Sequence, residues 1–208
     1  MGMTETRDLI SCSAVVLSGG LNSRMAGRNK AFIKVGRRAI LDRIMSVLEP
    51  IFKEILLVTR QPRAYKDYRL TVVEDIYANR ASLTGIHAGL VHTRSAYAFV
   101  VPCDAPFIKP AVVQKLIGYI DPGFDAIVPV SGEHYQPLCA IYSKRCIPPI
   151  EDQLQNVDYK IINIFDKIHL KTIPVESFRS IDPDLVSFFN VNTPETLALS
   201  QEMARHLV

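Results

Sequence analysis

Short apolar runs alternate along this chain with segments whose apolar residues recur every three or four positions. The runs are rich in aliphatic residues and end at glycine, proline or polar residues, which is typical of buried strands. The segments with the longer period are typical of helices that bury one face. The predicted strands are 14–18, 54–59, 71–73, 96–101, 125–130, 138–142 and 171–174, and the predicted helices are 40–48, 83–93, 110–120, 149–155, 161–167 and a last one from 194 onward.

Two prolines mark where predicted helices begin. Pro110 and Pro194 each stand in a first helical turn, where the missing N–H has no intrahelical partner to lose. Thr193 comes directly before Pro194, and we expect its hydroxyl to cap the last helix.

The alternation of strands and helices predicts an α/β fold. We expect a mostly parallel, Rossmann-like sheet with helices on both faces, which is a three-layer α/β/α arrangement. No repeat, low-complexity segment or linker interrupts the pattern. Residues 1–208 are therefore expected to form a single domain, in which 1–11 is a flexible N-terminal extension.

Polar or glycine features follow four of the predicted strands. They are the stretch 17–20, Thr59, the pair 74–75 and Asp104. Ligands of open α/β sheets bind beyond the carboxyl ends of the strands, so these features are expected to share one edge of the sheet.

Composition limits the classes of partner. The formal net charge of +3 over 208 residues is too small to indicate a nucleic-acid partner. The basic residues gather locally in 24–38 and 60–69, which suits a small polyphosphate better than a duplex. No apolar run approaches the length of a membrane span, and no signal peptide is evident at the N-terminus. Cys12, Cys103, Cys139 and Cys146 form no C-x-x-C pair, so we expect reduced, buried or half-buried thiols in a cytoplasmic protein.

The stretch from Leu17 to Lys30 indicates a phosphate-binding loop after the first strand. Gly19 and Gly20 would let backbone N–H groups approach a ligand closely, and Arg24 and Lys30 could neutralise a polyanion. The spacing is neither that of a Walker A loop nor that of a Rossmann fingerprint. The alternative is a simple Gly-Gly turn with basic residues on the surface.

Asp104 is a candidate Mg²⁺ ligand, because it follows a buried strand and stands between Pro102 and Pro106. The alternative is a structural aspartate that caps the following turn. Asp75 carries the same ambiguity and could also bind a base edge, a ribose or a metal-bound water. Lys30 and Arg24 are the candidate groups for stabilising negative charge in a nucleotidyl transfer.

The loop pattern L-S-G-G-x-x-S-R-M-x-G-x-x-K resembles the signature loop of the molybdenum cofactor guanylyltransferases. These belong to a wider family that includes the sugar-phosphate and isoprenoid cytidylyltransferases, with a sheet of the nucleotide-diphospho-sugar transferase type. The resemblance covers nearly the whole chain, and further stretches that carry it are 73–75, 82–86, 102–107, 136–142 and 189–195.

The resemblance implies roles for individual residues. Leu17, Ser18, Gly19 and Gly20 would contact the nucleotide, and a second glycine in this pair favours guanine over cytosine. Lys30 would meet the phosphates, Thr59 and Asp75 would contact the nucleotide, and Asp104 would hold both nucleotide and Mg²⁺. Asn190 and Asn192 would lie beside the pterin acceptor.

The chain departs from the family pattern at four positions. Ser18 replaces a small alanine, Asn29 stands where many members carry Asp, and Thr59 stands where the family has Asn. Ser82 takes the place of the usual Gly-Pro.

The implied activity is transfer of GMP from GTP to the phosphate of Mo-molybdopterin, with Mg²⁺ as cofactor and pyrophosphate as the leaving group. The product is the molybdopterin guanine dinucleotide cofactor. Other molybdenum cofactor biosynthesis proteins and molybdoenzyme chaperones are the expected protein partners. Two alternatives stay open: a cytidylyltransferase that acts on molybdopterin or another small phosphate, and a non-catalytic nucleotide-binding or cofactor-carrier protein.

Overall fold

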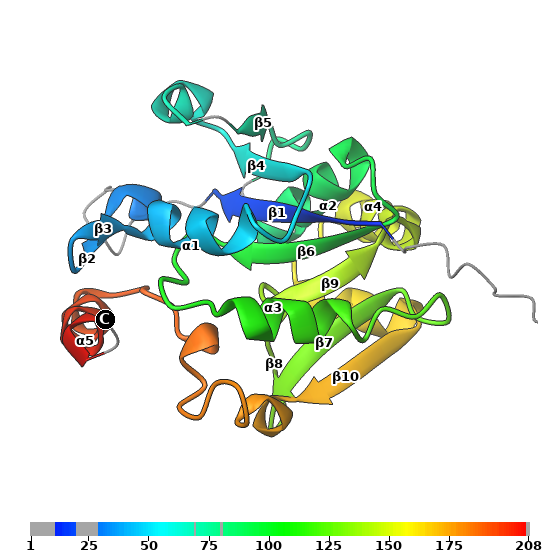
Figure 1. Ribbon diagram of the computed structural model, residues 1–208. Coiled ribbons are helices and arrows are strands. Elements are labelled where there is room, and N and C mark those ends of the chain that lie inside the picture. Colours follow the sequence, from blue (N-terminus) through cyan, green and yellow to red (C-terminus); the bar gives the residue numbers. More distant parts are fainter. Residues whose placement is uncertain (1–10, 20–28, 69, 80, 207–208) are drawn as a thin grey trace, which may run out of the picture.

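The computed structural model describes residues 11–19, 29–68, 70–79 and 81–206. The strands of the main sheet are β1 Cys12–Ser18, β4 Ile55–Thr59, β5 Thr71–Val73, β6 Tyr97–Pro102, β7 Ala126–Ser131, β8 His134–Tyr135, β9 Ala140–Ser143 and β10 Leu170–Pro174. The α-helices are α1 Ile40–Leu48, α2 Ser82–His92, α3 Pro110–Ile117, α4 Ile147–Gln155 and α5 Pro194–His206. A small hairpin, β2 Lys34–Val35 and β3 Arg38–Ala39, precedes α1 (Figure 1).

The sheet has the order β10-β7-β9-β6-β1-β4-β5, with β8 beside β7. β6, β1, β4 and β5 run parallel, and so do β10 and β7, which confirms the expected mostly parallel sheet. β9 is the exception, because it is antiparallel to both β6 and β7. The connection from β7 to β9 passes only through the short β8, whereas a parallel neighbour would need a longer crossover, usually a helix.

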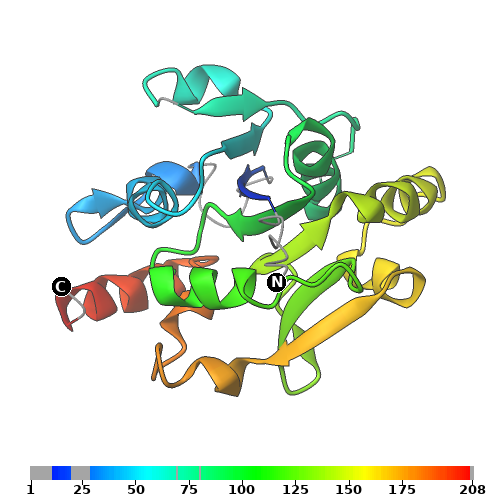
Figure 2. The same ribbon diagram turned by 45° about the vertical axis from the view of Figure 1, so that its right-hand side comes forward.

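Helices cover both faces of the sheet, which confirms the three-layer arrangement. In β1, Ala14 and Val16 pack in one core cluster with residues of α1 and α3. Val15 and Leu17 point to the other face and pack in a second cluster with residues of α2 and α4. Figures 1 and 2 show α1 and α3 on one side of the sheet and α2 and α4 on the other.

Helix α5 returns the C-terminal part of the chain to the hairpin before α1. The side-chain amide of Gln201 donates to the Lys34 carbonyl at 2.6 Å, and its oxygen accepts from the Gly36 N–H at 2.9 Å. The two segments lie side by side in both views of the fold (Figures 1 and 2). The C-terminal helix is thereby fixed close to the start of α1.

The element bounds differ from the predicted ones at a few ends. Helix α3 ends at Ile117 rather than at residue 120, and Gly118, a poor helix former, is its C-cap. Strand β9 begins at Ala140, because residues 136–139 form a turn closed by a hydrogen bond from the Cys139 N–H to the Gln136 carbonyl. The predicted flexible extension lies, apart from Ser11, outside the described residues.

The four cysteines are free, as the sequence predicts. Cys103, Cys139 and Cys146 are buried and Cys12 is half-buried. Burial raises the pKa of the Cys103 thiol to about 11 and that of the Cys12 thiol to about 12. All four are therefore protonated and weakly reactive near neutral pH.

The longest of the described α-helices is α5, which has 13 residues. A helix that crosses a bilayer needs about 20 apolar residues. Across the parts of the chain that the structure describes, no helix is long and apolar enough to cross a membrane.

Two glycines let α2 pack closely on β1. A Cβ added to Gly89 would lie 2.5 Å from Val15 Cγ1, and one added to Gly85 would lie 3.2 Å from Leu17 Cδ2. Val15 is a buried, β-branched strand residue, so it has little freedom to move aside. The close approach at Gly89 therefore fixes the depth at which α2 sits against the strand that leads to the glycine loop.

We predict that Gly89→Ala destabilises the protein although helix propensity alone favours the change by about 1 kcal/mol. Overpacking against Val15 outweighs that gain, so the free energy of unfolding should fall by about 1–2 kcal/mol. In a thermal melt followed by circular dichroism, Tm should drop by roughly 2–8 °C. Gly85→Ala is the matched control in the same helix and should change Tm little, because the Leu17 methyl can move. A rise in Tm for Gly89→Ala would contradict this packing account.

Candidate active site

The carboxyl ends of β4, β1 and β6 meet at one edge of the sheet. Ser18 of β1 lies opposite Thr59 of β4, and Leu17 lies opposite Pro102 of β6. Asp104 follows β6 by two residues, and the Cys103 N–H donates to the Leu17 carbonyl at 2.9 Å. The strand register therefore places the end of β1 beside the segment that carries Asp104.

Three predicted site residues meet at this edge through one ammonium group. Lys30 Nζ lies 3.0 Å from Asp104 Oδ2 and donates to Asn192 Oδ1 at 2.7 Å. The side chains of Lys30 and Asp104 are 16% and 15% exposed, so the ion pair is open to a ligand on one side. We call Lys30, Asp104 and Asn192 the Lys30 junction.

The segment that carries Asn192 is fixed on both sides. Before it, the Val191 N–H donates to the Asp104 carbonyl at 2.8 Å. The Asn192 N–H itself donates to Thr196 Oγ1 at 3.0 Å, and the Thr196 N–H donates to Thr193 Oγ1 at 3.3 Å. Thr193 thus caps α5 as the sequence predicts, and the cap also holds the backbone of Asn192.

The Lys30 side of the junction is held by its own local turn. Residues Lys30–Phe32 form a 3₁₀ turn whose N-cap is Asn29, because Asn29 Oδ1 accepts from the Ala31 N–H at 3.1 Å. Asn29 Nδ2 donates to the hydroxyl of the buried Tyr65 at 2.8 Å. Asn29 therefore links the turn to the protein interior.

The residues at the ends of β1 and β4 differ in which of their groups are exposed. The Ser18 hydroxyl is buried and hydrogen-bonded to the Tyr65 hydroxyl. Thr59 is also buried, and its Oγ1 accepts from the Gln61 N–H at 3.1 Å. Gly19 is exposed, and an added Cβ would meet nothing within 4 Å among the described residues. Of the three, the backbone at Gly19 is the part that faces open space.

Asp75 lies past the end of β5, at the opposite end of this row of strands from Asp104. Its Oδ2 accepts from the Thr84 hydroxyl at 2.6 Å and lies 3.5 Å from the Arg60 guanidinium. Its Oδ1 accepts from the Tyr77 N–H at 3.2 Å. The carboxylate is thus fixed in place and is not part of the Lys30 junction.

Arg60 holds the loop that follows Asp75 through hydrogen bonds to its backbone. Its guanidinium donates to the carbonyls of Tyr77, Ala78 and Asn79, the last two at 2.7 and 2.9 Å. Arg60 comes directly after Thr59, inside the second basic cluster of the sequence.

The other predicted residues are Gly20, Arg24 and Asn190. Gly20 and Arg24 fall outside the described residues. Asn190 is half-buried, and within the described part of the chain its side chain makes no hydrogen bond. Sequence reasoning also missed Tyr65 and Thr84, because neither stands in a motif with a recognisable spacing.

The donor set at the junction limits how a metal could be held. In the described part of the chain, no three His, Cys, Asp or Glu residues gather as a metal cage. Asp104 Oδ2 faces Lys30, and no hydrogen bond among the described residues reaches its Oδ1. A partly exposed carboxylate whose second oxygen has no hydrogen bond among the described residues suits Mg²⁺ that takes its other ligands from phosphate and water.

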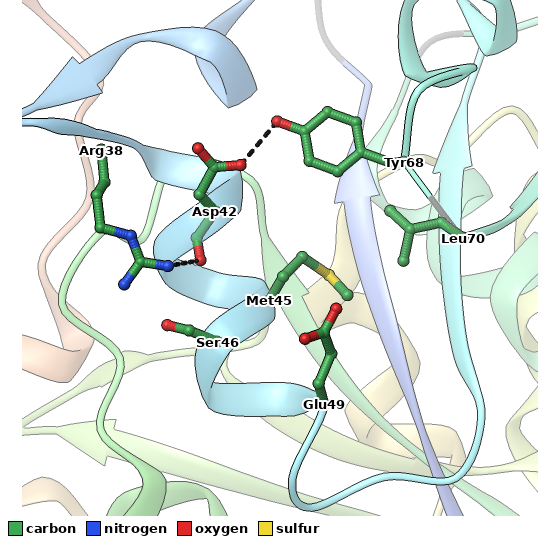
Figure 3. Close-up of a pocket in the computed structure, with 7 residues that line it drawn as sticks. All are labelled: Arg38, Asp42, Met45, Ser46, Glu49, Tyr68 and Leu70. Atoms are coloured by element: carbon green, nitrogen blue, oxygen red, sulfur yellow. Dashed lines mark hydrogen bonds between the residues drawn. The ribbon is translucent and has the colours of Figure 1, made fainter.

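A separate cavity of about 370 Å³ lies on the outer side of α1. Figure 3 shows the Tyr68 hydroxyl directed at Asp42, with which it hydrogen-bonds at 2.8 Å. Burial and the Asp42 carboxylate raise the pKa of Tyr68 to about 12. None of the predicted site residues lines this cavity, which is formed by Arg38, Asp42, Met45, Ser46, Glu49, Tyr68 and Leu70.

Known proteins share this sequence and fold over most of the chain. Residues 14–168 match the MobA-like NTP transferase domain. A molybdenum cofactor guanylyltransferase of Desulfosudis oleivorans is 38% identical over 185 residues, which are 89% of this chain and 92% of that protein. A probable molybdenum cofactor guanylyltransferase of Pelotomaculum thermopropionicum is 36% identical over 198 residues, with 95% of this chain and 96% of that protein covered.

A solved structure extends the agreement to the fold. The crystal structure of molybdopterin-guanine dinucleotide biosynthesis protein A from Archaeoglobus fulgidus superposes with a TM-score of 0.83 at 28% identity, over 93% of this chain and 99% of that one. The family match includes Lys30 and Asp104 of the junction and ends before Asn192, and the relatives match nearly end to end. The chain therefore belongs to the MobA-like NTP transferase family of nucleotidyltransferases.

Proposed function

We propose that the protein transfers GMP from GTP to the terminal phosphate of Mo-molybdopterin and releases pyrophosphate. The product is the molybdopterin guanine dinucleotide cofactor. Family membership and the names of the relatives support the choice of substrates. The observation that carries the proposal is the Lys30 junction, in which a cation, a carboxylate and an amide from distant segments of the chain meet.

Asp104 is the residue that we propose holds Mg²⁺. A single carboxylate together with phosphate oxygens and water is a common protein environment for this ion. When bound, Mg²⁺ would neutralise charge on the triphosphate and on the leaving pyrophosphate. Lys30, which lies 3.0 Å from the same carboxylate, would bind the phosphates through its ammonium.

The remaining chemistry is positioning and charge stabilisation. An oxygen of the acceptor phosphate attacks the α-phosphorus of GTP in line, and the bond from that phosphorus to the bridging oxygen breaks as pyrophosphate leaves. Lys30 and Arg24 would stabilise the negative charge that develops on the leaving group. The attacking phosphate oxygen is already anionic near neutral pH, so the transfer requires no protein base.

Other residues are assigned by their place around the junction. The backbone of Leu17, Ser18, Gly19 and Gly20 would hold the nucleotide, with Thr59 and Asp75 beside it. Asn190 and Asn192 would contact the pterin acceptor, as the resemblance of their segment to the family pattern implies. We further propose that residues 1–208 work as one domain in the cytoplasm, and that biosynthesis proteins and molybdoenzyme chaperones deliver and receive the cofactor.

We predict that GTP with Mg²⁺ stabilises the protein selectively in a thermal-shift panel of GTP, CTP, ATP and UTP. At a concentration near 100 Kd the gain is about 2.7 kcal/mol, which corresponds to a rise in Tm of roughly 5–10 °C. Selective stabilisation by CTP would instead indicate a cytidylyltransferase. Binding of GTP without pyrophosphate release in the presence of the acceptor would indicate a non-catalytic carrier.

We predict that Lys30→Ala lowers turnover by about 100-fold, because the loss of one charge-stabilising donor has effects of that size. Binding of GTP should weaken more than binding of guanosine, since the lysine acts on the phosphates. Lys34→Ala is the matched control, because Lys34 is exposed four residues further on. Titration calorimetry with both ligands checks this, and an equal loss for GTP and guanosine would refute the phosphate role.

We predict that Asn192→Ala raises KM for the pterin acceptor more than KM for GTP. The substitution removes the side-chain amide but keeps the backbone bond to Thr196, so thermal stability should change little. Thr193→Ala provides the converse control: it removes the capping hydroxyl, leaves Thr196 Oγ1 to accept from the Asn192 N–H, and should cost about 1 kcal/mol of stability. If Asn192→Ala lowers Tm and leaves both KM values unchanged, its role is confined to the cap.

A further inference from the structure

Tyr65 lies at the end of a short 3₁₀ turn, Pro62–Tyr65, that follows β4. Its side chain is fully buried, and its hydroxyl contacts the Ser18 hydroxyl at the end of β1. The same hydroxyl accepts from Asn29 Nδ2 at 2.8 Å. One phenol therefore joins the end of the first strand to the residue directly before Lys30.

Burial raises the pKa of Tyr65, and hydrogen bonds with Ser18 and Asn29 offset part of that effect. Thr59, opposite Ser18 in the sheet, lowers the pKa in the same way. The hydroxyl is thus protonated near neutral pH and can donate one hydrogen bond while it accepts from Asn29. A neutral phenol with several polar partners is a rigid anchor rather than an acid or base.

Asn29 connects the Tyr65 hydroxyl to the turn that carries Lys30. While Nδ2 binds Tyr65, Oδ1 accepts from the Ala31 N–H and so closes the turn Lys30–Phe32. The Phe32 ring also rests against the Tyr65 ring, with centroids 5.1 Å apart. The turn is therefore attached to Tyr65 at both ends, and the Lys30 side chain extends from it to Asp104 and Asn192.

We propose that Tyr65 is a positioning residue for the nucleotidyl transfer, whose hydroxyl sets the place of the Lys30 ammonium through Asn29. The proposal rests on the proposed function in one respect, that Lys30 meets the triphosphate. Tyr65 itself touches no substrate, because its side chain is fully buried behind Ser18 and Asn29.

Three departures of this chain from the pattern that it resembles lie around the same hydroxyl. Ser18 and Asn29 hydrogen-bond to it, and Thr59 lies opposite Ser18 in the sheet. Each of these side chains is short and carries a group that can hydrogen-bond to a phenol. Changing Ser18 or Asn29 alone should therefore disturb the hydrogen bond that the other makes with Tyr65.

Tyr65→Phe tests the proposal, because it removes the hydroxyl and keeps the ring against Phe32. Binding of GTP and of inorganic tripolyphosphate should weaken by about 5- to 10-fold, which is the size of effect expected from one lost hydrogen bond. Binding of guanosine should stay unchanged. Tyr68→Phe is the matched control, since Tyr68 also lies near Phe32 but gives its hydroxyl to Asp42; it should leave all three affinities unchanged.

A double-mutant cycle with Asn29→Ala separates positioning from a general loss of stability. If Tyr65 acts through Asn29, then Tyr65→Phe should weaken tripolyphosphate binding no further once Asn29 is alanine. Additive losses, or equal weakening of guanosine and GTP, would overturn the proposal.

Amide hydrogen exchange provides a readout that needs no nucleotide. Tyr65→Phe should speed exchange of the Ala31 amide by about tenfold, because the acceptor Asn29 Oδ1 loses its anchor. Tyr68→Phe should not change this rate. If the wild-type protein binds no triphosphate, but Tyr65→Phe still speeds exchange of the Ala31 amide, only the proposed function is refuted. If Tyr65→Phe leaves that exchange rate unchanged, the proposed role of Tyr65 is overturned.

Discussion

The position of one ammonium group, Lys30 Nζ, determines how the rest of this site is arranged. It joins Asp104, which is 74 residues away in sequence, to Asn192, which is 162 residues away. Partly exposed ion pairs contribute little to stability, so the value of this pair lies in its geometry. A ligand with negative charge can replace Asp104 as the partner of Lys30 and leave the carboxylate free for a cation. The pairing therefore keeps both groups close to where the proposed chemistry would need them.

The scaffold fixes the three parts of the junction by different contacts. The register of β1 with β6 places Asp104, the cap of α5 places Asn192, and the turn on Tyr65 places Lys30. The close packing of α2 against β1 fixes the distance between this helix and the first strand. Functional groups on loops and turns thus take their positions from strands and caps that are themselves rigid.

Much of this architecture could be predicted from the sequence, because its strands and helices have clear periods. Lys30 and Asp104 could be proposed as site residues from the chemistry of their motifs, and Asn192 from the resemblance of its segment to the family pattern. Their meeting at one ammonium could not be predicted, because contacts so distant in sequence depend on the strand order. The antiparallel direction of β9 was missed for a similar reason, as strand periodicity carries no direction. The burial of Tyr65 could not be predicted either, because this tyrosine stands in a polar stretch of the sequence, which is typical of an exposed segment.

A crystal structure with Mn²⁺ in place of Mg²⁺ and a non-hydrolysable GTP analogue would show directly whether Asp104 holds the metal and Lys30 binds the phosphates. The account predicts an anomalous peak about 2.1 Å from an Asp104 carboxylate oxygen, the distance expected for a small divalent ion. It also predicts that Lys30 Nζ has turned from Asp104 to a phosphate oxygen. A metal bound away from Asp104, with the Lys30–Asp104 pair intact beside a bound nucleotide, would contradict it.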